Sequence, residues 1–364
     1  MKHINIFLIL FIFLFFLSAC SEDKTSEINT QQPARTQPKG ETHETVPSQE
    51  IVLPETTTNY VTFTLNVHDW VFPEKSVEAV TKTIELHEKY NVPIDVYLDD
   101  QVFQIYMDQY PELVELINTS SVVTISYHIR PPMPTYILFE IFNLSSMTED
   151  EVYDFMLPYE EHALDLVTAL PDETKPGGYQ YIKDTFGHAP VTISLIENSD
   201  AEKRAMAKIY QEKGARLGIV HGRVIPFGQQ LYGMYLRPED VEIKWYEQLG
   251  GYMNDNLTAE SYLLSRVEEA GNGPGLVINI KMHEDNYYLS QTPFDPIYWT
   301  DSVRGDPSLP PYDLTRGIDG LKHKSFAQTA AQWEFYEDCL AYVSAHPELY
   351  TVLNTEQEAD MIGA

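Results

Sequence analysis

Two spacings of apolar residues alternate along the chain from residue 60 onward. Short runs rich in β-branched and aromatic residues predict strands, whereas apolar residues that recur every three or four positions predict helices. The predicted strands cover residues 61–67, 93–98, 122–127, 215–220, 276–282 and 349–353, with a further strand or loop starting at 177. The predicted helices cover residues 75–90, 110–117, 148–168, 201–213, 258–270 and 326–345, and a last one begins at 355.

This alternation of strands and helices predicts parallel strands that are joined by crossover helices. The fold class that follows is α/β, and with about seven such strands the expected architecture is a distorted, seven-stranded (β/α) barrel. One domain over residues 59–364 holds all of these elements. In such barrels, the residues that carry the chemistry lie at the carboxyl ends of the strands.

The first twenty residues have the composition of an export signal. Lys2 precedes an almost unbroken apolar run over residues 4–17, which is shorter than the roughly 20 residues that a spanning helix needs. We therefore expect a signal peptide over residues 1–20, followed by a flexible, polar tether over residues 21–58. The Leu-Ser-Ala-Cys sequence that ends at Cys20 resembles the bacterial lipobox. This resemblance implies a lipidated Cys20 that anchors the protein to the membrane of a bacterial cell envelope, although an ordinary signal peptide or an uncleaved anchor is the alternative.

The charge balance narrows the choice of partner. The 364 residues include 24 basic and 55 acidic residues, which gives a formal net charge of −31. Because the phosphates of nucleic acids would be repelled, we expect no nucleic-acid partner. The sequence also lacks a glycine-rich phosphate loop and a GxSxG nucleophile elbow, which argues against a nucleotide enzyme or a serine hydrolase.

Ionisable side chains follow three of the predicted strands. The three groups are His68-Asp69-Trp70 after strand 61–67, His128 after strand 122–127, and His283-Glu284-Asp285 after strand 276–282. Because the carboxyl ends of barrel strands share one rim, we expect these groups to converge. Histidine and carboxylate ligands suit a divalent ion such as Zn²⁺, which lowers the pKa of bound water to about 7 and polarises a carbonyl. A second histidine can then protonate a leaving group.

The first of these groups resembles a motif of the polysaccharide deacetylase superfamily. In that motif, a strand ends in a catalytic acid that is followed by a metal-binding Asp. The resemblance aligns Asp69 with the metal-binding Asp and places His68 where the family has its catalytic base. The role of His68 is therefore open, since an imidazole is able to act either as a base or as a ligand.

The other two groups resemble later motifs of the same superfamily. Ser126-Tyr127-His128 aligns His128 with the first metal-binding His of the second motif, whereas Pro132 occupies the position of the second metal-binding His. Residues 278–283 are similar to the closing motif, which implies that His283 is the general acid. Over residues 60–360, the resemblance implies an extracytoplasmic, metal-dependent hydrolase that removes N- or O-acetyl groups from a glycan, with a divalent metal as cofactor.

The remaining roles stay open at the level of sequence. Asp99 or Asp100, at the end of the second predicted strand, is the alternative source of a catalytic carboxylate, and Asp99 is our choice. His162 is the candidate for a third metal ligand. Arg130 pairs either with a catalytic carboxylate or with a substrate oxygen, and a surface salt bridge is the alternative.

We assign two tryptophans to substrate binding. Trp70 follows the first strand, and Trp299 lies in a long segment, residues 287–320, in which prolines and aromatic residues are frequent. A long loop of this kind in a compact domain is usually functional, and its aromatic rings would stack on sugars. A loop that is packed by its own side chains is the alternative.

Two other functions fit the same sequence. A glycoside hydrolase on a similar barrel would use two carboxylates, such as Asp99 and Asp285, about 5 to 9.5 Å apart and without a metal. A non-catalytic glycan-binding lipoprotein would bind sugar without turnover, and Pro132 in place of the second His favours it.

Overall fold

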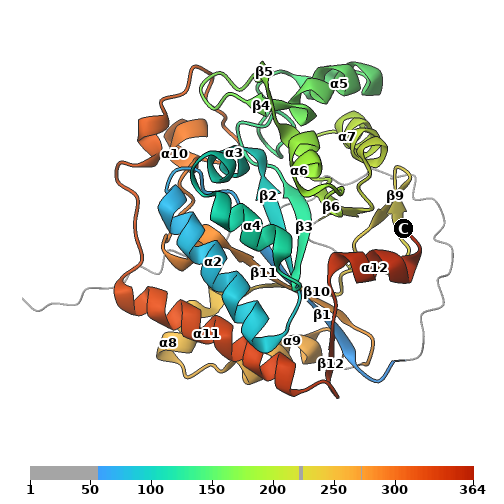
Figure 1. The fold of residues 1–364 in the computed structure, drawn as a ribbon, viewed down its shortest axis with the longest axis vertical. Helices are drawn as coiled ribbons and strands as arrows, with labels where there is room; N and C mark the ends of the chain where they lie inside the picture. The colour runs from blue at the N-terminus through green and yellow to red at the C-terminus, as the bar shows by residue number, and fades with distance from the viewer. Residues whose placement is uncertain (1–55, 221–223, 272) are drawn as a thin grey trace, which may run out of the picture. The chain divides into compact units, whose positions relative to one another are not determined.

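A computed structural model of the chain describes residues 56–220, 224–271 and 273–364 (Figure 1). The predicted signal peptide, Cys20 and all but the last three residues of the predicted tether lie outside the described residues. None of the helices in the described part of the chain combines the length and apolarity needed to cross a lipid bilayer.

The main sheet contains six strands, and all of its strand pairs are parallel. Its order is β10-β11-β1-β2-β3, with β12 paired to the beginning of β1. The strands are β1 (Asn59–Val67), β2 (Ile94–Asp99), β3 (Val123–His128), β10 (Val241–Lys244), β11 (Val277–His283) and β12 (Tyr350–Val352). Nearly every residue of β1 and β2 is buried, as expected for strands that are covered on both faces.

A second sheet continues the first, in the order β6-β7-β9-β8. Its strands are β6 (Thr192–Ser194), β7 (Leu217–Ile219), β8 (Gln230–Leu231) and β9 (Met234–Leu236), and a separate hairpin pairs β4 (His162–Leu164) with β5 (Pro171–Pro176). The Val191 amide, next to β6, donates to the Ile125 carbonyl of β3 at 2.9 Å. The predicted α/β fold with a parallel sheet is thereby confirmed.

Helices follow most of the strands and cover the sheets. They are α2 (Pro73–Tyr90), α3 (Asp100–Gln109), α4 (Pro111–Thr119), α5 (Glu149–Met156), α6 (Gly178–Phe186), α7 (Asp200–Lys213), α8 (Leu249–Asn254), α9 (Ala259–Glu269), α10 (Asp295–Tyr298), α11 (Phe326–Ala345) and α12 (Thr355–Ile362). In Figure 1, α2 lies over β1 and between α4 and α11, with which it also makes contacts.

Two predicted elements differ from the structure. The helix predicted over residues 148–168 ends at Met156, because Pro158 opens a short 3₁₀ turn, η2 (Leu157–Glu160), and strand β4 follows. The strand or loop predicted from residue 177 is instead helix α6, whose buried Tyr179, Ile182 and Phe186 have helical spacing.

A buried polar network fills the interior at the amino ends of the strands. Arg237, which follows β9, donates to Thr62 Oγ1 at 2.6 Å and to Thr64 Oγ1 at 2.9 Å, both on β1. Its Nε donates to Glu358 of α12 at 3.0 Å, and Asp95 of β2 lies 3.6 Å from its Nη2. This end is therefore occupied by internal ion pairs, which leaves the carboxyl ends of the strands for a ligand.

Candidate metal centre

Strand register brings three histidines to one edge of the main sheet. Asn66 of β1 is paired with His283 of β11, and Asp99 of β2 is paired with His128 of β3. The ring of His68 therefore lies between two others, with centroids 4.9 Å from His283 and 5.4 Å from His128.

His68, His283 and Asp285 form a compact group of possible ligands. One ligand atom from each side chain lies within 4.8 Å of the other two. His68 Nε2 is 3.6 Å from Asp285 Oδ1, and within residues 56–220, 224–271 and 273–364 neither atom has a hydrogen-bond partner, nor does His283 Nε2. Buried polar atoms without partners are costly, so facing groups of this kind are suited to a cation. Two imidazoles and one carboxylate form a donor set that Zn²⁺ accepts.

Glu284 holds the ends of β1 and β11 together behind this group. Its Oε1 accepts the backbone N–H groups of His68 and Asp69, and the Ser76 hydroxyl donates to it at 3.3 Å. Its Oε2 has no partner and lies 3.9 Å from His68 Nε2. Burial, together with the charges of Asp285 and Asp69, raises the pKa of Glu284 well above its ordinary value. Burial likewise raises the pKa of Asp285 to about 6.

Fixed neighbours determine where two of the histidines carry their protons. Arg130 Nε donates to His68 Nδ1 at 3.3 Å, so the proton of neutral His68 lies on Nε2, which faces Asp285. His128 Nδ1 donates to the Ile129 carbonyl at 2.8 Å, which leaves a lone pair on its Nε2. Burial, followed by the charge of Arg130, lowers the pKa of both histidines well below the ordinary value. Both rings are therefore neutral near pH 7.

Asp69, the metal ligand implied by the sequence motif, has its oxygens engaged. Its Oδ1 accepts the backbone N–H groups of Val71 and Phe72 at 2.9 and 3.1 Å. Its Oδ2 accepts a hydrogen bond from the Tyr288 hydroxyl at 2.6 Å. Burial raises the pKa of Asp69 to about 7. In this structure, Asp69 stabilises the turn that leads into α2.

The other predicted residues lie at varying distances from the metal group. Asp99 is buried and accepts the Gln101 N–H at 3.0 Å, which caps α3. His162 lies on β4, and among the described residues it belongs to no group of three or more possible ligands. Arg130 contacts His68, as described above, and also donates to the Tyr136 hydroxyl at 2.8 Å.

Both predicted sugar-stacking tryptophans are covered by protein. Trp299 is fully buried, with its ring 5.3 Å from Phe139. Trp70 is 9% exposed, and its ring lies 6.3 Å from that of Tyr298. Neither ring offers an open face to a ligand in this structure.

The sequence does not single out every residue of the centre. Glu284 and Asp285 follow His283 directly and belong to the groups that we expect to converge, but the sequence names Asp285 individually only as a glycosidase carboxylate and gives Glu284 no individual role. Tyr246, whose ring is 5.4 Å from that of His283, follows the short strand β10, and no sequence signal identified it.

Comparisons with known proteins give likenesses among solved structures only. No family model and no curated protein matches the chain. A CE4 family pseudoenzyme from Bacillus anthracis is 12% identical, with a TM-score of 0.32, and the alignment covers 63% of this chain but 57% of the pseudoenzyme. A probable polysaccharide deacetylase from Pseudomonas aeruginosa is 12% identical, with a TM-score of 0.44 and coverage of 83% and 90%. A putative polysaccharide deacetylase from Mycobacterium smegmatis is 12% identical, with a TM-score of 0.41 and coverage of 88% and 95%.

Proposed function

We propose that this protein is a metal-dependent hydrolase that removes acetyl groups from a glycan. The observation that carries the proposal is the group formed by His68, His283 and Asp285, whose facing nitrogen and oxygen atoms have no other partner. A divalent ion held by these atoms would activate water and polarise an acyl carbonyl. The sequence motifs that follow β1, β3 and β11 support the choice of deacetylation within this class of reaction.

Three further side chains, His128, Glu284 and Arg130, have roles in this proposal. His128 offers an unprotonated Nε2, and in this proposal it would accept the proton of the attacking water. Glu284 keeps the backbone of His68 and Asp69 fixed through two N–H groups, so it positions the His68 ring. Arg130 orients the same ring from the opposite side and would have to release Nδ1 when Nε2 binds an ion.

We also propose that the protein is exported and anchored to a bacterial cell envelope through lipidated Cys20. The support is the basic start, the apolar run and the Leu-Ser-Ala-Cys sequence at the beginning of the chain. Incorporation of a radiolabelled fatty acid tests this proposal, because Cys20→Ala should abolish the label. An equal label in the wild type and the variant would exclude acylation at this residue.

The experiment for the enzymatic proposal measures metal content and acetate release together. Purified protein is analysed for bound metal and incubated with N- and O-acetylated oligosaccharides. We expect Asp285→Asn and His283→Ala to lose both metal and turnover, whereas His188→Ala, which changes an exposed histidine, keeps both. His162→Ala distinguishes the ligand set proposed here from the set implied by sequence, since it should retain the metal. Full turnover in Asp285→Asn would overturn the assignment.

A non-catalytic sugar-binding role is the second candidate. Two observations favour it, namely the engagement of both Asp69 oxygens and the contact of Arg130 with His68. A binding protein would bind an acetylated oligosaccharide stoichiometrically and release no acetate when it is supplied with metal. Acetate release that depends on Asp285 would exclude this role.

A further inference from the structure

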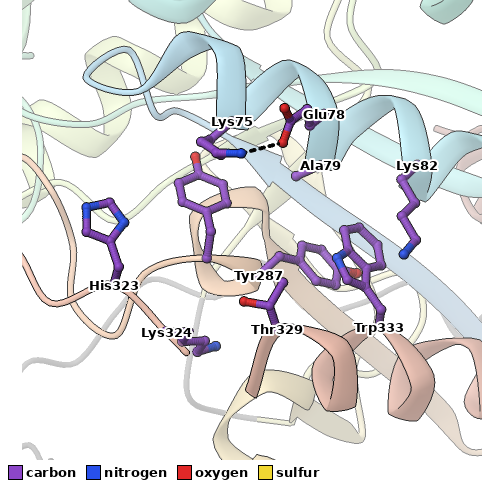
Figure 2. A pocket seen from close by; sticks show the side chains of 10 residues that line it. Lys75, Glu78, Ala79, Lys82, Tyr287, His323, Lys324, Thr329 and Trp333 are labelled. Atoms are coloured by element: carbon purple, nitrogen blue, oxygen red, sulfur yellow. Dashed lines mark hydrogen bonds and ion pairs between the residues drawn. The ribbon is translucent and has the colours of Figure 1, made fainter. Parts of the chain in front are cut away.

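A pocket lies outside the metal centre, on the outer side of η4 (Glu284–Tyr287). It has a volume of about 310 Å³ and lies between α2, η4 and the beginning of α11 (Figure 2). This volume is at the lower end of the range for ligand pockets, so it suits one small ring rather than an extended chain. None of the three proposed metal ligands lines it.

The charge of this pocket is opposite to that of the protein. Three lysines and one histidine line it, against a single glutamate, in a chain with a net charge of −31. In Figure 2, Lys75 and Lys82 come from α2, whereas His323 and Lys324 come from the segment before α11. A cationic cleft on a strongly acidic protein attracts anions that the rest of the surface repels.

Two of these cations form no ion pair within the described part of the chain. Lys75 is paired with Glu78 at 2.7 Å, which accounts for the glutamate. Among the described residues, no carboxylate lies at ion-pair distance from Lys82 or Lys324. Lys324 donates to two neutral acceptors, the Asn286 carbonyl and the Gln332 side chain, although it is mostly buried. An anion in the pocket would supply the missing charge through strong, charge-assisted hydrogen bonds.

Aromatic rings give the pocket an apolar wall beside these cations. Tyr287 and Trp333 are stacked with their centroids 3.5 Å apart and an interplanar angle of 6°. Lys82 Nζ lies over the Trp333 ring, 4.4 Å from its centroid, so a cation and an aromatic side chain are presented side by side. A pocket that has an aromatic wall and a few charged side chains favours a ligand that has both an apolar ring and an anionic group.

We propose that this pocket binds an acidic sugar residue, a pyranose that carries a carboxylate. The pocket also has a structural link to the metal centre. Tyr288 lines the pocket, and its hydroxyl donates to Asp69 at 2.6 Å. The sugar would therefore lie against Tyr288, the residue that hydrogen-bonds to Asp69 in the turn after β1. The site is independent of acetyl hydrolysis and stands whether or not the metal centre is active.

Isothermal titration of the full-length protein with single sugars tests this proposal. D-Glucuronate is the probe, glucose is the neutral match for its ring, and inorganic phosphate is the match for its charge. We expect saturable binding of glucuronate with a Kd of about 1 mM and at least tenfold weaker binding of glucose and phosphate. Lys82→Glu should weaken glucuronate binding at least tenfold, because it replaces an unpaired cation by an anion. Lys89→Glu, on the same helix but paired with Glu337 outside the pocket, should leave binding unchanged.

Each of the other results would overturn the proposal. No saturable binding of glucuronate at about 50 mM would show that the pocket is not a site for this ligand class. If phosphate bound as tightly as glucuronate, the pocket would be a general anion site. If glucose bound as tightly as glucuronate, the lysines would not contribute to binding. Unchanged affinity in Lys82→Glu would place the ligand elsewhere. Acetate release is measured in the same samples, and we expect Lys82→Glu to retain it, which separates this proposal from the enzymatic one.

Discussion

Removal of the Arg130 charge should strengthen metal binding by the centre. Arg130 Nε donates to His68 Nδ1 at 3.3 Å, which fixes the His68 proton on the nitrogen that faces Asp285. A metal at Nε2 requires the other tautomer, with a proton on Nδ1 that needs an acceptor. Arg130→Gln removes the positive charge and supplies an amide oxygen as that acceptor.

The geometry sets the size of this effect. An ion bound about 2 Å from Nε2, on the far side of the ring from the guanidinium, would lie about 7 Å from its charge. At an effective dielectric constant of about 20, two unit charges at this separation repel by about 2 kcal/mol. Because about 1.4 kcal/mol corresponds to a factor of ten, the variant should bind Zn²⁺ at least tenfold more tightly.

A competition titration against a chromophoric chelator at pH 7.5 measures the affinity directly. Arg216→Gln is the matched control, because Arg216 forms a surface ion pair with Asp360 and contacts no residue of the centre. Circular dichroism checks that both variants are folded. Unchanged or weaker Zn²⁺ binding by folded Arg130→Gln would refute the view that Arg130 competes with a cation at His68.

Three further predictions concern stability and are checked by urea denaturation. Burial raises the pKa of Glu197 to about 8, and among the described residues its two carboxylate oxygens lack partners, so the folded protein retains a proton that the unfolded protein loses. The free energy of unfolding should therefore fall as pH rises from about 5 to 8, and Glu197→Gln should flatten this dependence. Glu358→Ala, which removes one of the two carboxylates that pair with buried Arg237, should cost about 3 kcal/mol, and an unchanged midpoint would contradict the role of this ion pair. Gly178→Ala should cost at least about 1 kcal/mol, because φ is +60° and a Cβ would lie 2.5 Å from Glu160 Cα; wild-type stability would contradict this close contact.

Sequence patterns were sufficient wherever a segment determines its own structure. The strand that ends before His68 and the strand that ends at His283 are rich in apolar and β-branched residues, and both form as expected. The long helix α11 begins at Ser325 with a complete capping box and matches its predicted bounds. The secondary-structure predictions failed around Pro158 and Gly178. These two segments pack against each other, and the local sequence pattern does not reveal this contact.

The candidate site, like the fold, could be predicted from the sequence only in part. The rule that functional residues lie at strand ends led to His68, His128 and His283, whose rings the strand register places side by side. The atom that each side chain offers is decided by partners distant in sequence. Tyr288 engages Asp69 from 219 positions away, and Arg130 engages His68 from 62 positions away. No pattern within a single segment contains this information, so the ligand set implied by the motif differs from the group of possible ligands that the structure brings together.

The arrangement of charge around His68 is difficult to explain as structural alone. Asp69, Glu284 and Asp285 are buried close together, and burial raises the pKa of all three. Arg130, a buried cation of this region, hydrogen-bonds to a histidine and to the Tyr136 hydroxyl instead of to any of these acids. If the acids only stabilised the fold, a direct ion pair with Arg130 would cost less than three mutually repelling carboxyls. Perturbed groups gathered at strand ends are typical of functional sites. Within the described residues, atoms of His68, His283 and Asp285 lack partners, which supports the proposal that a cation binds there and is the basis for expecting Arg130 and a metal ion to compete.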